Sequence, residues 1–393
     1  MHVSHLSLRD FRNYRELELA LPPGTTLFYG PNAAGKTTLL EAVYYLATTR
    51  SPRTSANREL INWNAHGDLG LAPFTRIVAS IQRQAERLLI EVALQRKQDA
   101  DGNALPTTGQ TIRVNKTPRR ALDLVGQLRV VLFTPLDIDL VTGSPGVRRH
   151  WLDVMLSQLD GRYVRALSEY GKVLVQRNAL LRSWRDGRRP RPEEARRQLH
   201  PWDKQLTTTG VYVLVERQRA VRELNEEARP IHAEISGDPA PLRLAYLSTI
   251  LSNVQEKVEL LLAFQSQLEA GLREEIERGQ TLIGPHRDDA QFSLGDIDLG
   301  IYGSRGQQRS LTLALKLAEA ELMRGRTTDA PVLLLDDILS ELDAVRRAHL
   351  LQFIDRPDQQ TLMTAADLAD FDPSFLARIG RVRIDHGQVL GTH

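Results

Sequence analysis

Residues 30–37 read GPNAAGKT, and they lie between an apolar segment, TTLFYG (25–30), and a segment with helical spacing, KTTLLEAVYYLA (36–47). This order predicts a strand, then a glycine-bearing loop, then a helix. The loop matches the pattern G-x-x-x-x-G-K-[ST], in which glycines let backbone N–H groups point at phosphates. The stretch therefore predicts an α/β fold built around a phosphate site.

We expect every residue of this loop to contact a bound nucleotide or the cation that accompanies it. Lys36 would reach the β and γ oxygens, and the Thr37 hydroxyl would bind Mg²⁺. A chance match in a glycine-rich turn is the alternative, but the strand before the loop and the helix after it favour the phosphate site. The predicted nucleotide-binding residues are Gly30, Pro31, Asn32, Ala33, Ala34, Gly35, Lys36, Thr37 and Thr38, and Lys36 is also predicted to be catalytic.

Two carboxylates end a second apolar segment, VLLLDD (332–337). Ligands bind at the carboxyl ends of strands in open α/β sheets, so we predict that Asp336 binds Mg²⁺ and that Asp337 polarises the attacking water. A solvated strand end is the alternative. Adjacent aspartates repel each other when they lose water, which favours a cation beside them.

A polar turn, GSRGQQRS (303–310), enters a strongly periodic helix. Read alone, it predicts an N-capped helix. Beside the two motifs above it resembles the signature loop of ABC-type ATPases, and SELD (340–343) resembles their D-loop. That resemblance implies an ATP-dependent homodimer in which the signature loop of one subunit closes over the γ-phosphate bound to the other. Ser304, Gly306 and Gln307 would then bind nucleotide, and Ser304 would be catalytic.

The composition restricts the class of protein. There is no cysteine, which excludes disulfides and thiolate-held metal clusters, and net charge is only +2, so a nucleic-acid partner would need clustered cations. No run approaches the roughly 20 apolar residues that cross a bilayer, and the N-terminus is too charged for a signal peptide. We expect a cytoplasmic protein with no membrane partner.

Several motifs together resemble the RecF family, bacterial recombination mediators related to the Rad50 and SMC ATPase heads. The resemblance covers about residues 3–390. It implies slow DNA-stimulated ATP hydrolysis with ATP and Mg²⁺, and binding of single-stranded, duplex or gapped DNA. It also implies work with the RecO and RecR mediators in loading the recombinase during repair and replication restart. The additional motifs are LSLRDFRNYRELEL (6–19), SPGVRRHWLD (144–153), TLIGPHRDD (281–289) and LLLDDILSELD (333–343).

The resemblance sets a fold class: α/β, an ABC-type P-loop ATPase head with an attached antiparallel β-subdomain and an inserted helical arm domain. Residues 1–146 would form the N-terminal part of the ATPase lobe. Residues 147–279, where long helical patterns dominate, would form the arm. Residues 280–393 would form the C-terminal part of the lobe, with the signature, the paired aspartates and the D-loop.

This sequence departs from the general ABC pattern at two places. The residue after the predicted Mg²⁺ ligand is an aspartate, where glutamate is more usual, and a shorter side chain suits a slow switch. The expected switch histidine is absent after TLMT (361–364), so Thr364 or Asp367 would sense the γ-phosphate.

Other residues have two interpretations each. By comparison with related heads, Arg12 would bind nucleotide and Arg53 would contact phosphate or DNA, whereas the alternative for Arg12 is a surface arginine. The resemblance places His286, Arg287, Asp288 and Asp289 at a lobe interface, although four polar residues can also form a charged loop. Metal binding by His286 with the aspartates is the disfavoured third interpretation.

Two basic segments are candidates for DNA. Residues 182–197 hold seven arginines against three acidic residues, and Trp184 among them would stack on a base. The second candidate comprises Lys116, Arg119 and Arg120. A solvated loop is the alternative for the first segment.

Two other functions compete with recombination mediation. A transporter's nucleotide-binding subunit would carry its signature far closer to the phosphate loop than Ser304 lies to Lys36. A scaffold would bind ATP only to hold a dimer together, and it would not hydrolyse ATP.

Overall fold

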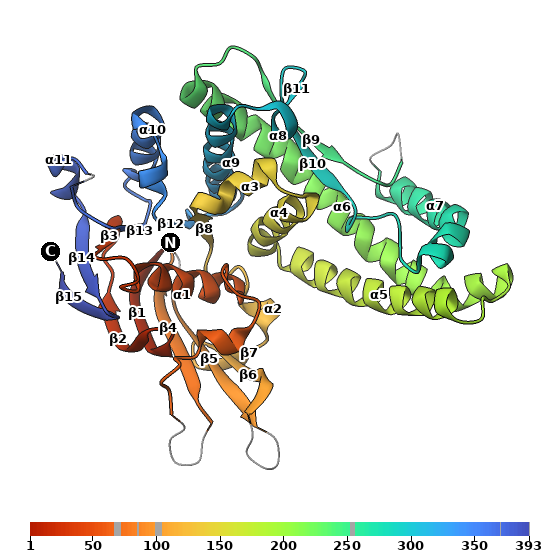
Figure 1. Ribbon diagram of the computed structural model, residues 1–393, viewed down its shortest axis with the longest axis horizontal. Coiled ribbons are helices and arrows are strands. Elements are labelled where there is room, and N and C mark those ends of the chain that lie inside the picture. Colours follow the sequence, from red (N-terminus) through yellow and green to blue (C-terminus); the bar gives the residue numbers. More distant parts are fainter. Residues whose placement is uncertain (67–71, 85, 99–103, 252–255, 370, 393) are drawn as a thin grey trace. The chain divides into compact units, whose positions relative to one another are not determined.

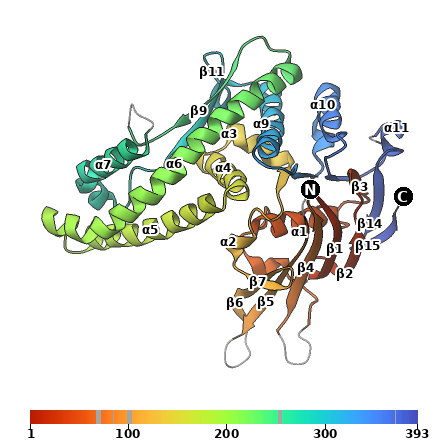
Figure 2. The same cartoon turned by 180° about the vertical axis from the view of Figure 1, so that it is seen from behind.

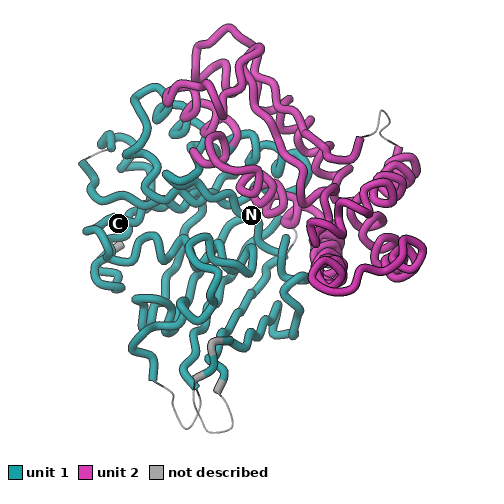
Figure 3. The backbone as a smooth tube through the Cα atoms, turned by 45° about the vertical axis from the view of Figure 1, so that its right-hand side comes forward, with its two compact units in different colours: residues 1–137, 316–393 teal, residues 138–315 magenta. Residues whose placement is uncertain are grey.

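The computed structural model describes all residues except 67–71, 85, 99–103, 252–255, 370 and 393. The chain forms two compact units (Figure 3). Unit 1 comprises residues 1–137 and 316–393, and unit 2 comprises residues 138–315. Both ends of the chain therefore build unit 1, and unit 2 is an insertion between them.

A mainly parallel sheet forms the centre of unit 1, with strand order β15-β14-β3-β13-β12-β8. Only β15 pairs antiparallel to its neighbour. Every residue of β12 and β13 is buried, as expected for strands covered on both faces. The strands are β3 (Thr25–Tyr29), β8 (Val130–Phe133), β12 (Val332–Leu335), β13 (Thr361–Ala365), β14 (Gly380–Asp385) and β15 (Gln388–Thr392).

A second, antiparallel sheet completes unit 1, with strand order β2-β1-β4-β5-β6-β7. Helix α1 (Lys36–Thr48) contacts strands of both sheets (Figures 1 and 2). All of its residues except Thr37 are buried, which explains a helix that is apolar on nearly every side. The strands are β1 (His2–Phe11), β2 (Tyr14–Ala20), β4 (Phe74–Gln82), β5 (Arg87–Gln98), β6 (Ala104–Val114) and β7 (Thr117–Arg119).

Further helices lie in the connections between these strands. They are α2 (Ala121–Leu124), α10 (Ala344–Ile354), α11 (Pro373–Leu376) and the 3-10 helices η1 (Asn57–Leu60), η2 (Pro135–Ile138) and η3 (Ile338–Glu341). Helix α9 (Arg305–Arg326) begins in unit 2 and ends in unit 1, because the boundary falls between Leu315 and Lys316.

Unit 2 consists of packed helices and a small sheet. The long helices α5 and α6 pack against each other and against α7 around Tyr170, Leu206 and Phe264 (Figure 1). The sheet has strand order β11-β10-β9. The elements are α3 (Asp139–Thr142), α4 (Pro145–Leu159), α5 (Gly161–Asp186), α6 (Pro192–Ser236), α7 (Lys257–Arg278), α8 (Leu299–Tyr302), β9 (Leu242–Leu247), β10 (Asp289–Leu294) and β11 (Ile297–Asp298).

The inserted unit is larger than residues 147–279, the bounds expected from the sequence. Strand β10 pairs with β9 from Asp289 opposite Leu247 to Leu294 opposite Leu242. This pairing ties residues beyond 279 to the insertion, so unit 2 ends later than expected. Unit 2 also begins earlier than expected, at Ile138. The insertion also contains a sheet and is not helical throughout.

Candidate functional site

The phosphate loop lies between β3 and α1, and its backbone requires glycine at both ends. Gly30 has φ +147°, and a Cβ there would lie 2.0 Å from the backbone oxygen of Ile384 in β14. Gly35 has φ +113°. The conformation therefore follows from the two glycines of the motif, since other residues rarely adopt such angles. Ala33, with φ +63°, also has a left-handed backbone.

Lys36 folds back over its own loop. Its Nζ donates to the carbonyl oxygens of Gly30 (2.7 Å) and Pro31 (2.8 Å). Burial lowers the pKa of Lys36, and the charges of Asp337 and Asp336 oppose that shift. A phosphate group beside the ammonium would replace lost solvation with a direct charge pair.

The three parallel strands β3, β13 and β12 bring a cluster of oxygen atoms together at their carboxyl ends. The Thr37 hydroxyl donates to Asp336 Oδ1 (2.6 Å), and the Thr364 hydroxyl donates to the same oxygen (3.0 Å). Hydroxyl and carboxylate oxygens are the ligands that Mg²⁺ accepts from proteins, with water completing the octahedron. The chemistry of Thr37 and Asp336 therefore fits the predicted cation.

Asp337 follows with a left-handed backbone, φ +52°, and its N–H donates to the Thr364 hydroxyl (2.9 Å). Its side chain lines the pocket. Burial, then repulsion from Asp336, raises its pKa, while Lys36 lowers it. A carboxylate with a raised pKa is a better hydrogen-bond acceptor for water, which suits the role expected for Asp337.

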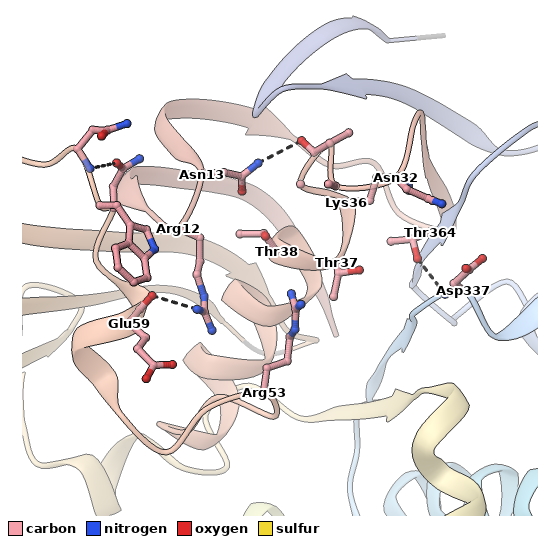
Figure 4. A pocket seen from close by; sticks show the side chains of 16 residues that line it. Arg12, Asn13, Asn32, Lys36, Thr37, Thr38, Arg53, Glu59, Asp337 and Thr364 are labelled. Atoms are coloured by element: carbon pink, nitrogen blue, oxygen red, sulfur yellow. Dashed lines mark hydrogen bonds between the residues drawn. The ribbon is translucent and has the colours of Figure 1, made fainter.

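Most of these residues line one pocket of about 710 Å³ in unit 1, but Gly30, Pro31 and Asp336 do not. Figure 4 shows Arg12 and Arg53 on one side of it and Asp337 and Thr364 on the other. Of the two expected γ-phosphate sensors, Thr364 lines the pocket and Asp367 does not. The predicted residues in its lining are Arg12, Asn32, Ala33, Ala34, Gly35, Lys36, Thr37, Thr38, Arg53, Asp337 and Thr364.

Arg12 is fixed in place by ion pairing. Its Nε and Nη2 donate to the two carboxylate oxygens of the buried Glu41 (3.0 and 2.7 Å), and Nη1 donates to the Glu59 carbonyl (3.0 Å). Arg12 is therefore neither a loosely held surface arginine nor a cation without a counter-ion. Arg53 is exposed and lines the same pocket, with no ion pair to any described residue.

Residues outside the motif donate hydrogen bonds to carbonyl oxygens of the phosphate loop. Asn13 Nδ2 and Gly387 N both donate to the Ala34 carbonyl (3.2 and 2.8 Å), and the Tyr14 hydroxyl donates to the Gly35 carbonyl (3.1 Å). The turn between β14 and β15, close to the end of the chain, thus supports the phosphate loop. Sequence reasoning missed these contacts because no spacing rule links Gly387 to residue 34.

Trp63 is the largest side chain of the pocket that sequence reasoning missed. Trp63 is 80% exposed although it lines the pocket. Trp63 lies in a turn that is held next to Arg12. The Arg12 N–H donates to the Leu60 carbonyl (2.9 Å), and the Asn64 N–H donates to Asn62 Oδ1 (2.8 Å). An aromatic residue between two asparagines is the signal that the sequence offered.

The signature-like segment begins α9 in unit 2. The Ser304 hydroxyl accepts from Gln307 N (3.2 Å), and Gln307 Oε1 accepts from Ser304 N (2.9 Å). This reciprocal pair is a capping box. Ser304, Arg305 and Gly306 are exposed, and none of them lines the pocket of unit 1. The structure thus shows the capping role, and the nucleotide-binding role stays a prediction.

The GPHRDD segment lies inside unit 2. Asp288 is fully buried and accepts from the Tyr246 hydroxyl (2.8 Å) and from the Thr249 N–H and hydroxyl (2.7 Å each). His286 Nδ1 lies 2.6 Å from the Tyr170 hydroxyl, and burial lowers its pKa to about 4. Asp289 pairs with Arg148 (2.7 Å). These contacts form a polar network within unit 2. Among the described residues, no group of three or more His, Cys, Asp or Glu side chains could hold a metal ion.

One expectation for the basic segment 182–197 is wrong. Trp184 is 6% exposed and packs in a cluster with Leu181, Ala195, Leu199 and Leu272. It cannot stack on a base because it belongs to the hydrophobic core between helices. The second basic candidate, Lys116, Arg119 and Arg120, is fully at the surface around β7.

Comparisons with known proteins find matches over nearly the whole chain. The RecF/RecN/SMC N-terminal domain model matches residues 2–371. The chain is 59% identical over 392 residues to the DNA replication and repair protein RecF of Herpetosiphon aurantiacus, covering 99% of this chain and 100% of that protein. It is 56% identical to the same protein of Chloroflexus aurantiacus, with the same coverage.

Solved structures also show a similarity to RecF. The chain resembles a recombination mediator RecF with ATP in the RecFOR pathway, with a TM-score of 0.85, 27% identity, and coverage of 100% of this chain and 97% of that one. An Smc head bound to the C-terminal winged-helix domain of ScpA matches with a TM-score of 0.53 and 14% identity, covering 100% and 97%, which indicates a shared fold alone. In the part of the chain that the structure describes, no helix has the length and apolar character to span a membrane.

Proposed function

This chain belongs to the RecF family, within the RecF/RecN/SMC N-terminal domain proteins, and from that premise we propose that it is an ATP-dependent, DNA-binding recombination mediator. It binds ATP with Mg²⁺, dimerises on ATP and hydrolyses it slowly, faster with DNA. It binds gapped DNA or single-strand/duplex junctions in the cytoplasm, and with RecO and RecR it helps to load the recombinase in repair and replication restart.

One observation carries the ATP part of the proposal. Thr37 and Asp336 are 299 residues apart in the chain, yet their side-chain oxygens lie 2.6 Å apart at the mouth of the phosphate loop. The loop hydroxyl and the strand-end carboxylate of a P-loop NTPase hold Mg²⁺ in that arrangement. Asp337 and Lys36 flank the pair with the charges that hydrolysis needs.

The residues divide the reaction between them. The N–H groups of the loop and Lys36 would bind the β- and γ-phosphates, replacing the Gly30 and Pro31 carbonyls as partners of Nζ. Mg²⁺, held by Thr37 and Asp336, would neutralise charge on the β and γ oxygens. Asp337 would accept a hydrogen bond from water and orient it toward the γ-phosphorus, and Thr364 would respond to the loss of that phosphate.

Trp63 would bind the base. The indole is exposed at the rim of the pocket that the phosphate loop borders, and every nucleobase has a face on which it can stack. An aromatic platform at this position explains why so large an apolar side chain is left in solvent.

The second subunit would complete the site. Ser304 and Gly306 are exposed at the N-terminus of the 22-residue helix α9, where helix dipole and N–H groups favour an anion. The Ser304–Gln307 capping pair orders this terminus before any partner arrives. One signature per chain would then give two ATP molecules at the interface of a head-to-tail pair.

The experiment that tests this function is steady-state ATP turnover by the full chain, with no DNA and with single-stranded, duplex and gapped DNA. We expect slow turnover that rises with DNA, and Asp337→Asn should abolish it while leaving ATP binding intact. ATP binding without turnover under every condition would overturn hydrolysis and favour the ATP-held scaffold. Absence of ATP binding would overturn the whole proposal.

A further inference from the structure

The turn between α5 and α6 lies at one end of a three-helix packing in unit 2. Leu181 and Trp184 from α5, Ala195 and Leu199 from α6, and Leu272 from α7 form a buried cluster there. The Arg185 guanidinium also donates to the Arg278 carbonyl at the end of α7 (3.3 Å). The turn is therefore held in place by a buried hydrophobic cluster at the end of the three helices.

Seven arginines and no lysine occupy residues 182–197. Two have carboxylate partners: Arg185 pairs with Asp186 (2.7 Å) and Arg196 with Glu269 (3.0 Å). The other five are exposed and, within the described part of the chain, have no ion pair. We call them the arginine cluster: Arg182, Arg188, Arg189, Arg191 and Arg197.

We infer that the arginine cluster binds the phosphate backbone of DNA; this assignment rests on the proposed function, in which the protein binds DNA. A guanidinium offers a fork of N–H donors that matches the oxygens of a phosphate, and its weak hydration lowers the cost of leaving water. Five such groups, none of them in an ion pair within the described part of the chain, form a concentrated positive surface on a single turn and its flanking helices.

The burial of Trp184 decides what this surface can recognise. No other aromatic residue lies in residues 182–197, so the segment has phosphate-binding groups and no platform for a base. Contacts to phosphate position DNA without carrying sequence information. The cluster therefore binds the backbone of duplex segments with little dependence on sequence.

The second basic candidate for DNA binding has a structural explanation of its own. Arg119 is the last residue of β7, which is an edge strand of the antiparallel sheet, and Lys116 and Arg120 flank that strand. Charged side chains on an edge strand prevent another strand from pairing with it. These three cations thus have a role that needs no DNA, and they provide a matched control.

The test compares two triple variants of the full chain. One is Arg188→Gln with Arg189→Gln and Arg191→Gln, and the other is Lys116→Gln with Arg119→Gln and Arg120→Gln. Each removes three exposed positive charges without touching the nucleotide pocket. DNA affinity is measured by fluorescence anisotropy with labelled duplex and gapped DNA, with ATP and Mg²⁺, over a salt series. ATP turnover without DNA is measured alongside.

We expect the arginine-cluster variant to bind DNA roughly a hundredfold more weakly at physiological salt, because each arginine–phosphate pair releases about 0.9 counterion when it forms. The slope of log affinity on log salt should become shallower by about 0.9 for each arginine that no longer pairs with a phosphate. The β7 variant should bind as the unchanged protein does, and both should retain turnover without DNA. Unchanged affinity in the arginine-cluster variant, or weaker binding confined to the β7 variant, would overturn the assignment. Failure of the unchanged protein to bind any DNA would instead show that the proposed function is wrong.

Discussion

Replacing Gly30 with alanine should damage the nucleotide site through sterics alone, without removing a functional group. The new Cβ would lie 2.0 Å from the Ile384 oxygen and 3.2 Å from its carbon. Both are backbone atoms of β14, so neither can rotate away. Because the loop lies directly on that strand, either the loop or β14 must move.

The cost follows from two contributions. An overpacked contact costs about 1–3 kcal/mol, and a left-handed backbone costs a residue with a Cβ about 1–2 kcal/mol. The loop of the variant can shift and so avoid part of this strain. If the shift avoids about 2 kcal/mol, ATP binding must return the loop to its original position at that cost, and the affinity for ATP falls roughly thirtyfold. We therefore expect Gly30→Ala to fold and to bind ATP at least that much more weakly.

Gly24→Ala is the matched control at the other end of β3. Gly24 also has a positive φ, +83°, but a Cβ there would meet nothing within 4 Å. The Gly24→Ala protein should lose about 1–2 kcal/mol of stability, the cost of a positive φ for a residue with a Cβ, and it should keep its affinity for ATP. Isothermal titration with ATP and Mg²⁺, beside urea unfolding, separates the two effects. A folded Gly30→Ala protein with unchanged ATP affinity would refute the reasoning about the loop.

The remaining predictions concern other parts of the molecule. Ser304→Arg should bind ATP but stay monomeric in size-exclusion chromatography with ATP and Mg²⁺, because a bulky cation blocks the signature loop; dimerisation at the normal ATP concentration would contradict that role. Asp337→Asn should instead remain an ATP-bound dimer without turnover, and a monomer would indicate a structural role for this carboxylate. ATP should change the tryptophan fluorescence through Trp63, since the other three tryptophans are at least partly buried. Trp63→Ala should remove this fluorescence change and weaken ATP binding about tenfold. A fluorescence change that persists in Trp63→Ala would exclude Trp63 as the residue on which the base stacks. Because His286 is neutral in the fold, with a pKa of about 4 against an ordinary 6.5, the unfolded chain binds more protons and stability falls as pH falls. The free energy of unfolding should drop by about 1.4 kcal/mol between about pH 7.5 and 5.5 from this group, and urea unfolding of His286→Gln should lack that part of the drop.

The sequence predicted the phosphate site because short-range rules determine it. Glycines at positions 30 and 35, a strand before them and a buried helix after them specify the loop without any distant contact. Asp336 was predicted for a similar reason, since a buried parallel strand has a known end where ligands bind. Its contact with Thr37 needed only the expectation that both strands lie in one sheet.

Long-range packing accounts for what the sequence did not predict. Trp184 was expected at a surface because its neighbours are arginines, yet helical periodicity directs it toward Leu199 and Leu272 in other helices. The extent of unit 2 depended on the pairing of β10 with β9, which no local pattern specifies. Ser304 shows a third limit: one sequence signal, a serine before a helix, serves both capping and anion binding, and only the first is a contact within one chain.

The most direct test of a site shared between two subunits is ATP turnover by a mixture of two inactive variants. Lys36→Ala lacks a working phosphate loop but keeps its signature, and Ser304→Arg has the opposite defect. If the signature acts on the partner's ATP, a mixed dimer contains one complete site, because the intact loop of Ser304→Arg meets the intact signature of Lys36→Ala. The altered signature then faces a loop that holds no ATP, so the added cation does not prevent this dimer from closing. We predict that each variant alone is nearly inactive and that the mixture hydrolyses ATP well above either. A mixture no more active than its components would contradict the shared site.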